Sequence, residues 1–236
     1  MFGQNPIRKA NYSSTALRVQ EIFKTIQGEG PFAGHPAIFI RLAGCSLRCW
    51  FCDTDFESNY HNLMTPREVA EKVKELIGDS KIKLVVFTGG EPMLQRIGSA
   101  IICIQNRLQE VHTQIETSGT HCAPALEFLV RNGLVTIVCS PKTGKVNQRI
   151  AELTDHWKYV ISLSDRGFLR HTQNPEKEGS TYFPPITKNT RIYLQPCDEG
   201  PGNEEKSRKN LEQCITLAQQ EGFILSLQLH KILGMP

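Results

Sequence analysis

The sequence predicts an α/β fold in which helices cover a mainly parallel sheet. Short β-branched runs alternate with helical segments and make about six strand–helix units. Several runs, such as Leu84–Phe87, are almost continuously apolar, which is typical of strands covered on both faces. Right-handed crossovers between such strands give either a doubly wound sheet or a sheet curved into a full or partial barrel.

Seven segments are expected to be strands. Ligands of parallel α/β folds bind at the carboxyl ends of the strands, and each motif below falls at or just after a strand end. We therefore expect the motifs to converge at one edge of the sheet. The expected strands are Ala37–Arg41, Leu84–Thr88, Thr113–Glu116, Val135–Cys139, Tyr159–Ile161, Arg191–Gln195 and Ile224–Gln228.

Three helices have recognisable end signals. Thr65-Pro-Arg-Glu68 combines an N-cap, an N1 proline and an N3 glutamate, and predicts a helix reaching about Ile77. A second helix is expected to start at Pro124 and to end near residue 132. A third runs from Asn203, with Gly222 as the glycine just past its end.

Length and composition favour one globular domain. The 236 residues allow one sizeable core, and 39 % hydrophobic with 22 % charged residues is an ordinary globular composition. We expect residues 1–18 to be a mobile extension and residues 19–236 to be a single domain. The net charge of +3 is spread along the chain, which disfavours direct nucleic-acid binding.

The expected compartment is the cytoplasm. Residues 1–18 lack the apolar core of a signal peptide, and no segment is apolar over the length that a bilayer requires, so no membrane contact is expected. In such a chain, 8 cysteines indicate thiolates more than a disulfide framework.

The most specific motif is Cys45-Ser-Leu-Arg-Cys49-Trp-Phe-Cys52, a C-x3-C-x2-C pattern after an expected strand. Three thiolates satisfy three irons of a [4Fe–4S] cluster and leave the fourth open. That iron can chelate the amino and carboxylate groups of S-adenosylmethionine (SAM). One-electron cleavage of the bound SAM then gives a 5′-deoxyadenosyl radical.

A zinc site or a disulfide fits the three cysteines less well than a cluster does. A structural zinc site needs a fourth ligand, usually in a second cysteine pair, and the remaining five cysteines are scattered singly. A disulfide leaves one thiol over and needs an oxidising compartment. Most of those five cysteines are expected to be buried residues with a structural role. A non-catalytic zinc module therefore stays open as a minor alternative.

A second motif, Thr88-Gly-Gly-Glu-Pro92, follows the next strand. Its glycines allow the backbone to approach a ligand closely, and Glu91 could accept from the ammonium group of that ligand. Phe51, between two of the cysteines, could stack on an adenine ring or simply cover the loop.

With these motifs the sequence resembles the radical SAM superfamily, and more closely its 7-carboxy-7-deazaguanine synthase family. The resemblance runs from about Gln20 to Pro236. The motifs that carry the closer resemblance are Ile26-Gln-Gly-Glu-Gly30, Arg41-Leu-Ala-Gly-Cys45, Cys52-Asp-Thr54, Glu116-Thr-Ser-Gly119, Ser140-Pro-Lys142, Gln195-Pro196 and Leu229-His-Lys231.

The resemblance implies a modified, partial (β/α)6-type barrel and a specific reaction. In that reaction 6-carboxy-5,6,7,8-tetrahydropterin becomes 7-carboxy-7-deazaguanine and ammonia, in the biosynthesis of 7-deazapurines such as queuosine. The resemblance further implies a [4Fe–4S] cluster, SAM, Mg²⁺, a flavodoxin- or ferredoxin-type reductant and a homodimer. A glycyl-radical activating enzyme is the alternative, which predicts an exposed docking surface in place of a closed pocket.

The resemblance also assigns roles to residues. Gln27 has an amide suited to a pterin edge, and Arg41 can pair with the substrate carboxylate in two bonds, although an arginine at a strand end is often only a surface residue. Glu116 and His230 would contact the substrate or move protons. The implied substrate site is Ile26, Gln27, Gly28, Arg41, Thr88 and the terminal carboxylate of Pro236. The implied SAM site is Phe51, Gly90, Ser140, Pro141, Lys142, Gln195, Pro196, Cys197 and Asp198, with Cys45, Cys49 and Cys52 on the cluster and Thr54 on Mg²⁺.

Overall fold

The computed structural model describes residues 5–52, 54–163 and 181–235, which form a curved sheet of nine strands. The strand order is β3-β1-β2-β4-β5-β6-β7-β8-β9. The strands are β1 (Leu17–Ile26), β2 (Pro36–Leu42), β3 (Leu63–Met64), β4 (Leu84–Gly89), β5 (His112–Thr117), β6 (Val135–Cys139), β7 (His156–Ile161), β8 (Arg191–Pro196) and β9 (Ile224–Leu225).

The sheet is parallel from β2 to β9, and its two ends are not joined. β1 is the exception, because it runs antiparallel to both β2 and β3. An open, curved and mostly parallel sheet confirms the prediction of a partial barrel.

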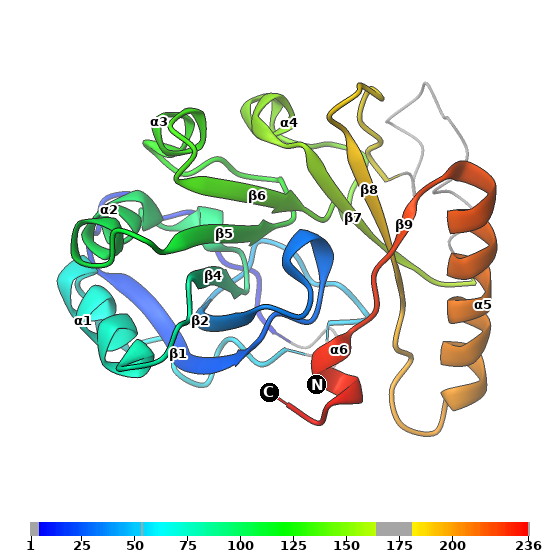
Figure 1. Cartoon of the computed structure of the whole chain (residues 1–236), viewed down its shortest axis with the longest axis horizontal. Coiled ribbons are helices and arrows are strands. Elements are labelled where there is room, and N and C mark those ends of the chain that lie inside the picture. Colours follow the sequence, from blue (N-terminus) through cyan, green and yellow to red (C-terminus); the bar gives the residue numbers. More distant parts are fainter. Residues whose placement is uncertain (1–4, 53, 164–180, 236) are drawn as a thin grey trace.

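Helices α1 to α5 lie on the outer side of this sheet (Figure 1). They are α1 (Pro66–Ile77), α2 (Ile97–Arg107), α3 (Leu126–Arg131), α4 (Gln148–Leu153) and α5 (Glu204–Glu221); the short α6 (Leu229–Ile232) contacts β1. Two 3₁₀ turns, η1 (Gly30–Phe32) and η2 (Pro92–Leu94), follow β1 and β4. The core lies between the helices and the sheet, where Val73 of α1 and Ile101 of α2 are fully buried with Phe87 of β4.

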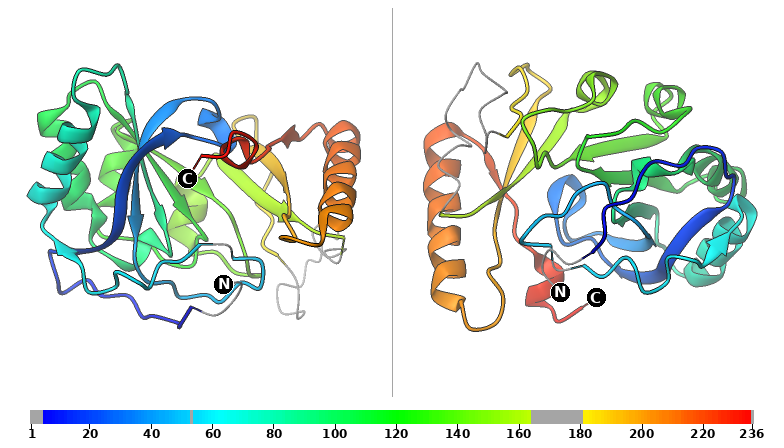
Figure 2. Two further views of the ribbon diagram at one scale, coloured as in Figure 1. Left: turned by 90° about the horizontal axis from the view of Figure 1, so that it is seen from below. Right: turned by 180° about the vertical axis from the view of Figure 1, so that it is seen from behind.

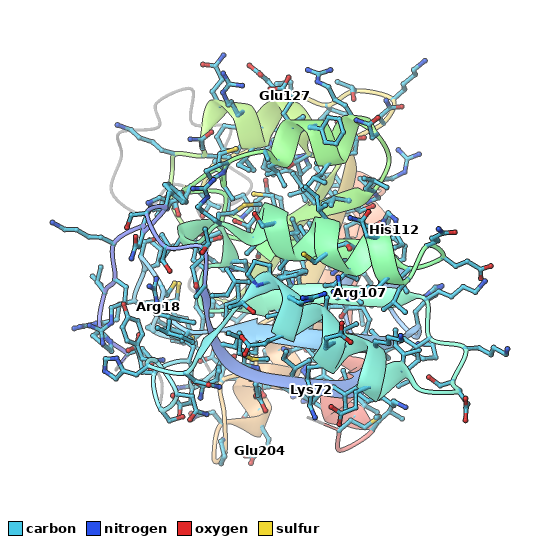
Figure 3. All side chains as sticks on the ribbon, turned by 90° about the vertical axis from the view of Figure 1, so that its left-hand side faces the viewer. Arg18, Lys72, Arg107, His112, Glu127 and Glu204 are labelled. Atoms are coloured by element: carbon cyan, nitrogen blue, oxygen red, sulfur yellow. The ribbon has the colours of Figure 1, made fainter. Side chains whose placement is uncertain are left out.

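The outer surface of the helices is charged. Lys72 on α1 and Glu127 on α3 point outward in Figure 3, and Arg107 of α2 pairs with Glu71 of α1 at 2.8 Å. No helix among the described residues combines the length and apolarity needed to cross a bilayer. The exposed charges and the buried side chains beneath them are the usual arrangement of a helix covering a core.

The expected ends of α1 and α5 agree with the structure, whereas α3 begins at Leu126 rather than at the expected Pro124. The capping box is present, with Glu68 N donating to Thr65 Oγ1 at 3.3 Å and Thr65 N donating to Glu68 Oε2 at 2.7 Å. Gly222 ends α5 with a φ of 70°, a left-handed conformation that glycine adopts without strain.

Several strands differ from expectation: β3 is an additional short strand, and β7 begins at His156 rather than at Tyr159. β1 was not predicted, because Arg18, Glu21 and Lys24 interrupt its apolar pattern. The final strand is shorter than expected, ending at Leu225 rather than at residue 228.

Residues 5–16 belong to the extension that we expected to be mobile. In the structure they lie beside the loop that follows β2 (Figure 2), and Ile7 forms a bridge with Cys45.

Candidate active site

A cavity of about 270 Å³ opens at the carboxyl ends of the parallel strands. Arg41 at the end of β2, Thr88 at the end of β4, Glu116 on β5 and Gln195 on β8 all line it. The expected convergence of the motifs at one edge of the sheet is therefore observed.

Most predicted site residues line this cavity. They are Ile26, Gln27, Arg41, Cys45, Cys49, Phe51, Cys52, Thr54, Thr88, Gly90, Glu116, Ser140, Lys142, Gln195, Cys197, Asp198 and His230. Gly28, Pro141 and Pro196 are not among the lining residues. Pro236 lies outside the described residues.

The three cysteines of the motif are partly buried, form no disulfide and lie on one wall of the cavity. Burial raises the pKa of Cys45 to about 12 and also raises that of Cys49, where the charge of Lys142 opposes the effect. Without a cation the thiols of Cys45 and Cys49 are therefore neutral at pH 7. Iron would deprotonate them, since metal binding to thiols releases protons.

The donor chemistry of this wall fits an iron–sulfur cluster. No group of three or more His, Cys, Asp or Glu side chains in the described chain is placed to share one metal ion. A [4Fe–4S] cluster needs no such convergence, because each iron takes its own thiolate. Leu47 N donates to Cys45 Sγ at 3.4 Å, the kind of amide–sulfur contact that tunes such clusters.

The Thr88–Pro92 motif packs directly on the start of the loop that carries the three cysteines (residues 45–62, here called the cysteine loop). Glu91 N donates to Gly44 O at 2.9 Å, and a Cβ on Gly90 would lie 2.0 Å from that same oxygen. Only glycine fits this approach, which explains the residue type at position 90 without reference to a ligand.

Glu91 has a different role from the one that the motif suggested. It is almost fully buried and does not line the cavity. Its carboxylate accepts from Met93 N at 3.0 Å, from Thr117 Oγ1 at 2.7 Å and from Ser118 N at 2.8 Å. Glu91 thus joins η2 to the end of β5, and the expectation that it binds a ligand ammonium group is wrong for this conformation.

Glu116 connects two residues of the predicted substrate site. Gln27 Nε2 donates to its Oε1 at 3.0 Å, and Thr88 Oγ1 donates to its Oε2 at 2.9 Å. Gln114 Nε2 also donates to Oε1, at 3.1 Å. The carboxylate therefore orients an amide and a hydroxyl at the cavity wall.

Arg41 is held at the cavity by its neighbours on β1. Its Nε lies 3.1 Å from Glu21 Oε1 without the geometry of a hydrogen bond, and its Cζ lies 5.2 Å from the centre of the Phe23 ring. The guanidinium is thus positioned but not saturated, which suits binding of a further carboxylate.

Lys142 also lines the cavity, where it lies between Ser140 and Phe51. Its Nζ donates to Ser140 Oγ at 2.5 Å and lies 5.3 Å from the centre of the Phe51 ring. Burial, followed by the charge of Lys158, lowers the pKa of Lys142 to about 8. A bound anion would favour its charged form.

Glu29, Lys158 and Gln228 line the cavity and form a connected polar group that was not among the predicted site residues. Lys158 Nζ donates to Glu29 Oε2, and Gln228 Nε2 donates to Glu29 Oε1 at 2.9 Å. Burial by itself would raise the pKa of Glu29, but Lys158 and Gln228 outweigh it and hold the pKa below its ordinary value. The sequence signal that could have revealed this group is Lys158, a charged residue within the mainly buried strand β7.

The C-terminal segment closes one side of the cavity. His230 lines it, and a Cβ on Gly28 would lie 2.2 Å from His230 Nδ1. Lys231 Nζ donates to Asp198 Oδ2 at 2.8 Å, and this bond lowers the pKa of Asp198. Residues near both ends of the chain therefore build the same wall.

This fold, with three thiols at the carboxyl ends of its strands, defines a radical SAM enzyme. The model of the Radical SAM superfamily matches residues 39–164. More narrowly, the chain belongs to the 7-carboxy-7-deazaguanine synthase family.

Two relatives carry that assignment. The enzyme of this name from Rickettsia prowazekii is 40 % identical over 242 residues, covering 100 % of this chain and 96 % of its own length. The one from Rhodospirillum rubrum is 36 % identical, covering 99 % of each chain. The fold is similar to the crystal structure of QueE from Escherichia coli, with a TM-score of 0.63 and 24 % identity over 90 % of this chain and 94 % of that one. Membership of the superfamily implies a [4Fe–4S] cluster and SAM as cofactors.

Proposed function

We propose that this protein converts 6-carboxy-5,6,7,8-tetrahydropterin into 7-carboxy-7-deazaguanine with loss of ammonia. The observation that carries the proposal is that Cys49 and Gln27 line one cavity. The wall predicted to hold the cluster therefore faces the amide predicted to read the pterin. A glycyl-radical activating enzyme, which acts on a protein partner, does not require such a polar pocket.

Each side chain has a defined task in this proposal. In this proposal Cys45, Cys49 and Cys52 hold the cluster, while Lys142 and Ser140 would contact the anionic part of SAM. When bound, cluster and SAM supply a one-electron cleavage that removes a hydrogen atom from C6 of the pterin. Arg41 binds the substrate carboxylate, and Glu116 orients Gln27 and Thr88 toward the pterin ring.

Three further parts of the proposal rest on family resemblance. Thr54 would bind Mg²⁺, which takes few protein ligands and accepts oxygens from the substrate. The terminal carboxylate of Pro236 would face the guanidine-like edge of the pterin, in a charge-assisted pair. A flavodoxin- or ferredoxin-type protein would supply the electron to a homodimer. None of the 8 cysteines, all of them among the described residues, forms a disulfide, and this supports the proposed cytoplasmic location.

The test is an anaerobic assay of the reconstituted protein with the carboxytetrahydropterin, SAM, Mg²⁺ and a reductant. We expect mass spectrometry to detect 7-carboxy-7-deazaguanine, with less SAM consumed than product formed. Cleavage of SAM without any change in the pterin would show that the substrate is different.

A further inference from the structure

The segment of residues 5–12, here called the N-terminal strap, lies along the cysteine loop. Arg8 N donates to Cys45 O at 2.6 Å, next to the bridge between Ile7 and Cys45. Asn5 Nδ2 donates to Thr54 O at 3.0 Å. The strap therefore contacts the loop at its first residue, Cys45, and at Thr54, the proposed Mg²⁺ ligand.

Arg8 anchors the strap through its side chain. Its Nη2 lies 2.7 Å and its Nε 3.2 Å from Glu57 Oε2, and its Cζ lies 4.1 Å from the centre of the Tyr60 ring. The aliphatic part of Arg8 also covers Gly44, because a Cβ there would lie 3.4 Å from Arg8 Cγ. The side chain of Arg8 thus joins the strap to Gly44, which precedes Cys45, and to the later part of the loop at Glu57 and Tyr60.

The other end of the strap is attached elsewhere. Asn11 N donates to Leu94 O at 2.9 Å, and Tyr12 Oη donates to Met93 O at 2.7 Å. Both acceptors belong to η2, which follows the Thr88–Pro92 motif. The strap therefore reaches from the cysteine loop to η2, next to the motif that contains Gly90, a proposed SAM contact.

The loop itself has little regular structure to hold it. Between the bridge at Cys45 and the start of β3 at Leu63, its described residues form only turns and bends. Within its first half, Cys52 N donates to Cys49 O at 3.2 Å. Irregular loops depend on contacts from outside for their order.

We infer that the N-terminal strap orders the cysteine loop for cluster binding, with Arg8 as a positioning residue. This inference rests on the proposed role of the three cysteines, but not on the identity of the substrate. Without the bond pair to Glu57, the loop samples more conformations, and a bound cluster is lost faster.

The experiment compares three variants of the full chain with the wild type. Arg8→Ala removes the anchor, and Arg8→Lys keeps the charge without the two-bond geometry. Arg107→Ala is the matched control, because it removes another guanidinium–carboxylate pair between two elements, on the outer helices. The readouts are the rate at which anaerobically reconstituted protein releases iron to a chelator, and amide hydrogen exchange of residues 45–62 in cluster-free protein.

We expect Arg8→Ala to release iron roughly fivefold faster, as the loss of a partly exposed two-bond ion pair allows. Exchange in residues 45–62 should rise, Arg8→Lys should be intermediate, and Arg107→Ala should match the wild type in both readouts. Wild-type iron release and exchange in Arg8→Ala would overturn the inference. A wild type that binds the cluster but leaves the pterin unchanged would refute the proposed substrate and leave the strap intact.

Discussion

Gln27 donates a hydrogen bond from its side-chain amide to Glu116, 3.0 Å away, across 89 positions of the sequence. Gln27 follows the antiparallel strand β1, whereas Glu116 lies near the end of the parallel strand β5. The bond therefore sets the position of the loop after β1 relative to the barrel-like part of the sheet. The side-chain oxygen of Gln27 accepts from Glu29 N at 3.1 Å, so both ends of the amide are held by the protein.

We predict that Glu116→Gln raises the KM for the pterin roughly tenfold, because a glutamine side chain cannot accept from Gln27, Gln114 and Thr88 together. Steady-state kinetics on reconstituted enzyme measure this change. A fall in kcat at unchanged KM would instead indicate that Glu116 reacts directly with the substrate. Glu110→Gln, at an exposed pair with Lys83, is the control and should leave both constants unchanged.

Cys49→Ala should abolish the visible charge-transfer absorption of the reconstituted protein and all turnover, because one iron loses its thiolate. Cys103→Ala is the control, since Cys103 is a partly buried, free thiol on α2, away from the cavity. Full absorption and activity in Cys49→Ala would remove this residue from the cluster.

Thr54→Ala should eliminate the stimulation of activity by Mg²⁺, whereas Thr54→Ser should retain it, because the hydroxyl is the proposed ligand. Both variants keep the backbone carbonyl that accepts from Asn5. Activity titrated against Mg²⁺ measures the effect, with SAM cleavage as a separate readout that should persist. The same Mg²⁺ dependence in wild type and alanine variant would place the metal elsewhere.

The ion pair of Glu29 and Lys158 should matter for stability. Lys158→Met leaves the buried Glu29 without its cation and should lower the free energy of unfolding by about 3 kcal/mol. The double variant with Glu29→Gln should recover part of that loss, because neither charge is then buried alone. Urea unfolding of the cluster-free protein measures both values.

The same pair predicts a dependence of stability on pH. The pKa of Glu29 is lower in the folded state than in the unfolded state. The stability that Glu29 contributes is therefore complete at a pH above its unfolded-state pKa. It is lost as the pH falls through its folded-state pKa. The wild type should therefore lose more stability in acid than the double variant. Parallel stability curves for the two proteins would contradict this assignment.

Gly28→Ala should raise the KM for the pterin while the cluster is retained. The new Cβ would lie 2.2 Å from His230 Nδ1 and 2.9 Å from His230 N, so α6 has to move away from the cavity. Kinetics together with the cluster absorption separate this local effect from misfolding. An unchanged KM would show that the position of α6 does not affect substrate binding.

Local patterns were sufficient for much of this protein. The cysteine spacing, the capping box of α1 and the apolar runs of β4 and β6 each depend on residues that are close in sequence. Periodicity and end signals report these features directly. The position of the cavity also followed, because the carboxyl ends of parallel strands meet at one edge of a sheet.

The tertiary structure decided the rest. Three side-chain pairs join segments that are far apart in the sequence, and no local pattern predicts them. They are Glu29 with Lys158, Glu116 with Gln27 and Arg8 with Glu57. Glu91 shows the same limit, since its motif suggested a ligand and the fold supplied Met93, Thr117 and Ser118 instead. A side chain's partners depend on which distant segments pack beside it. Sequence therefore predicted the chemistry that the wall of the cavity offers, while packing determined which of those groups are already paired.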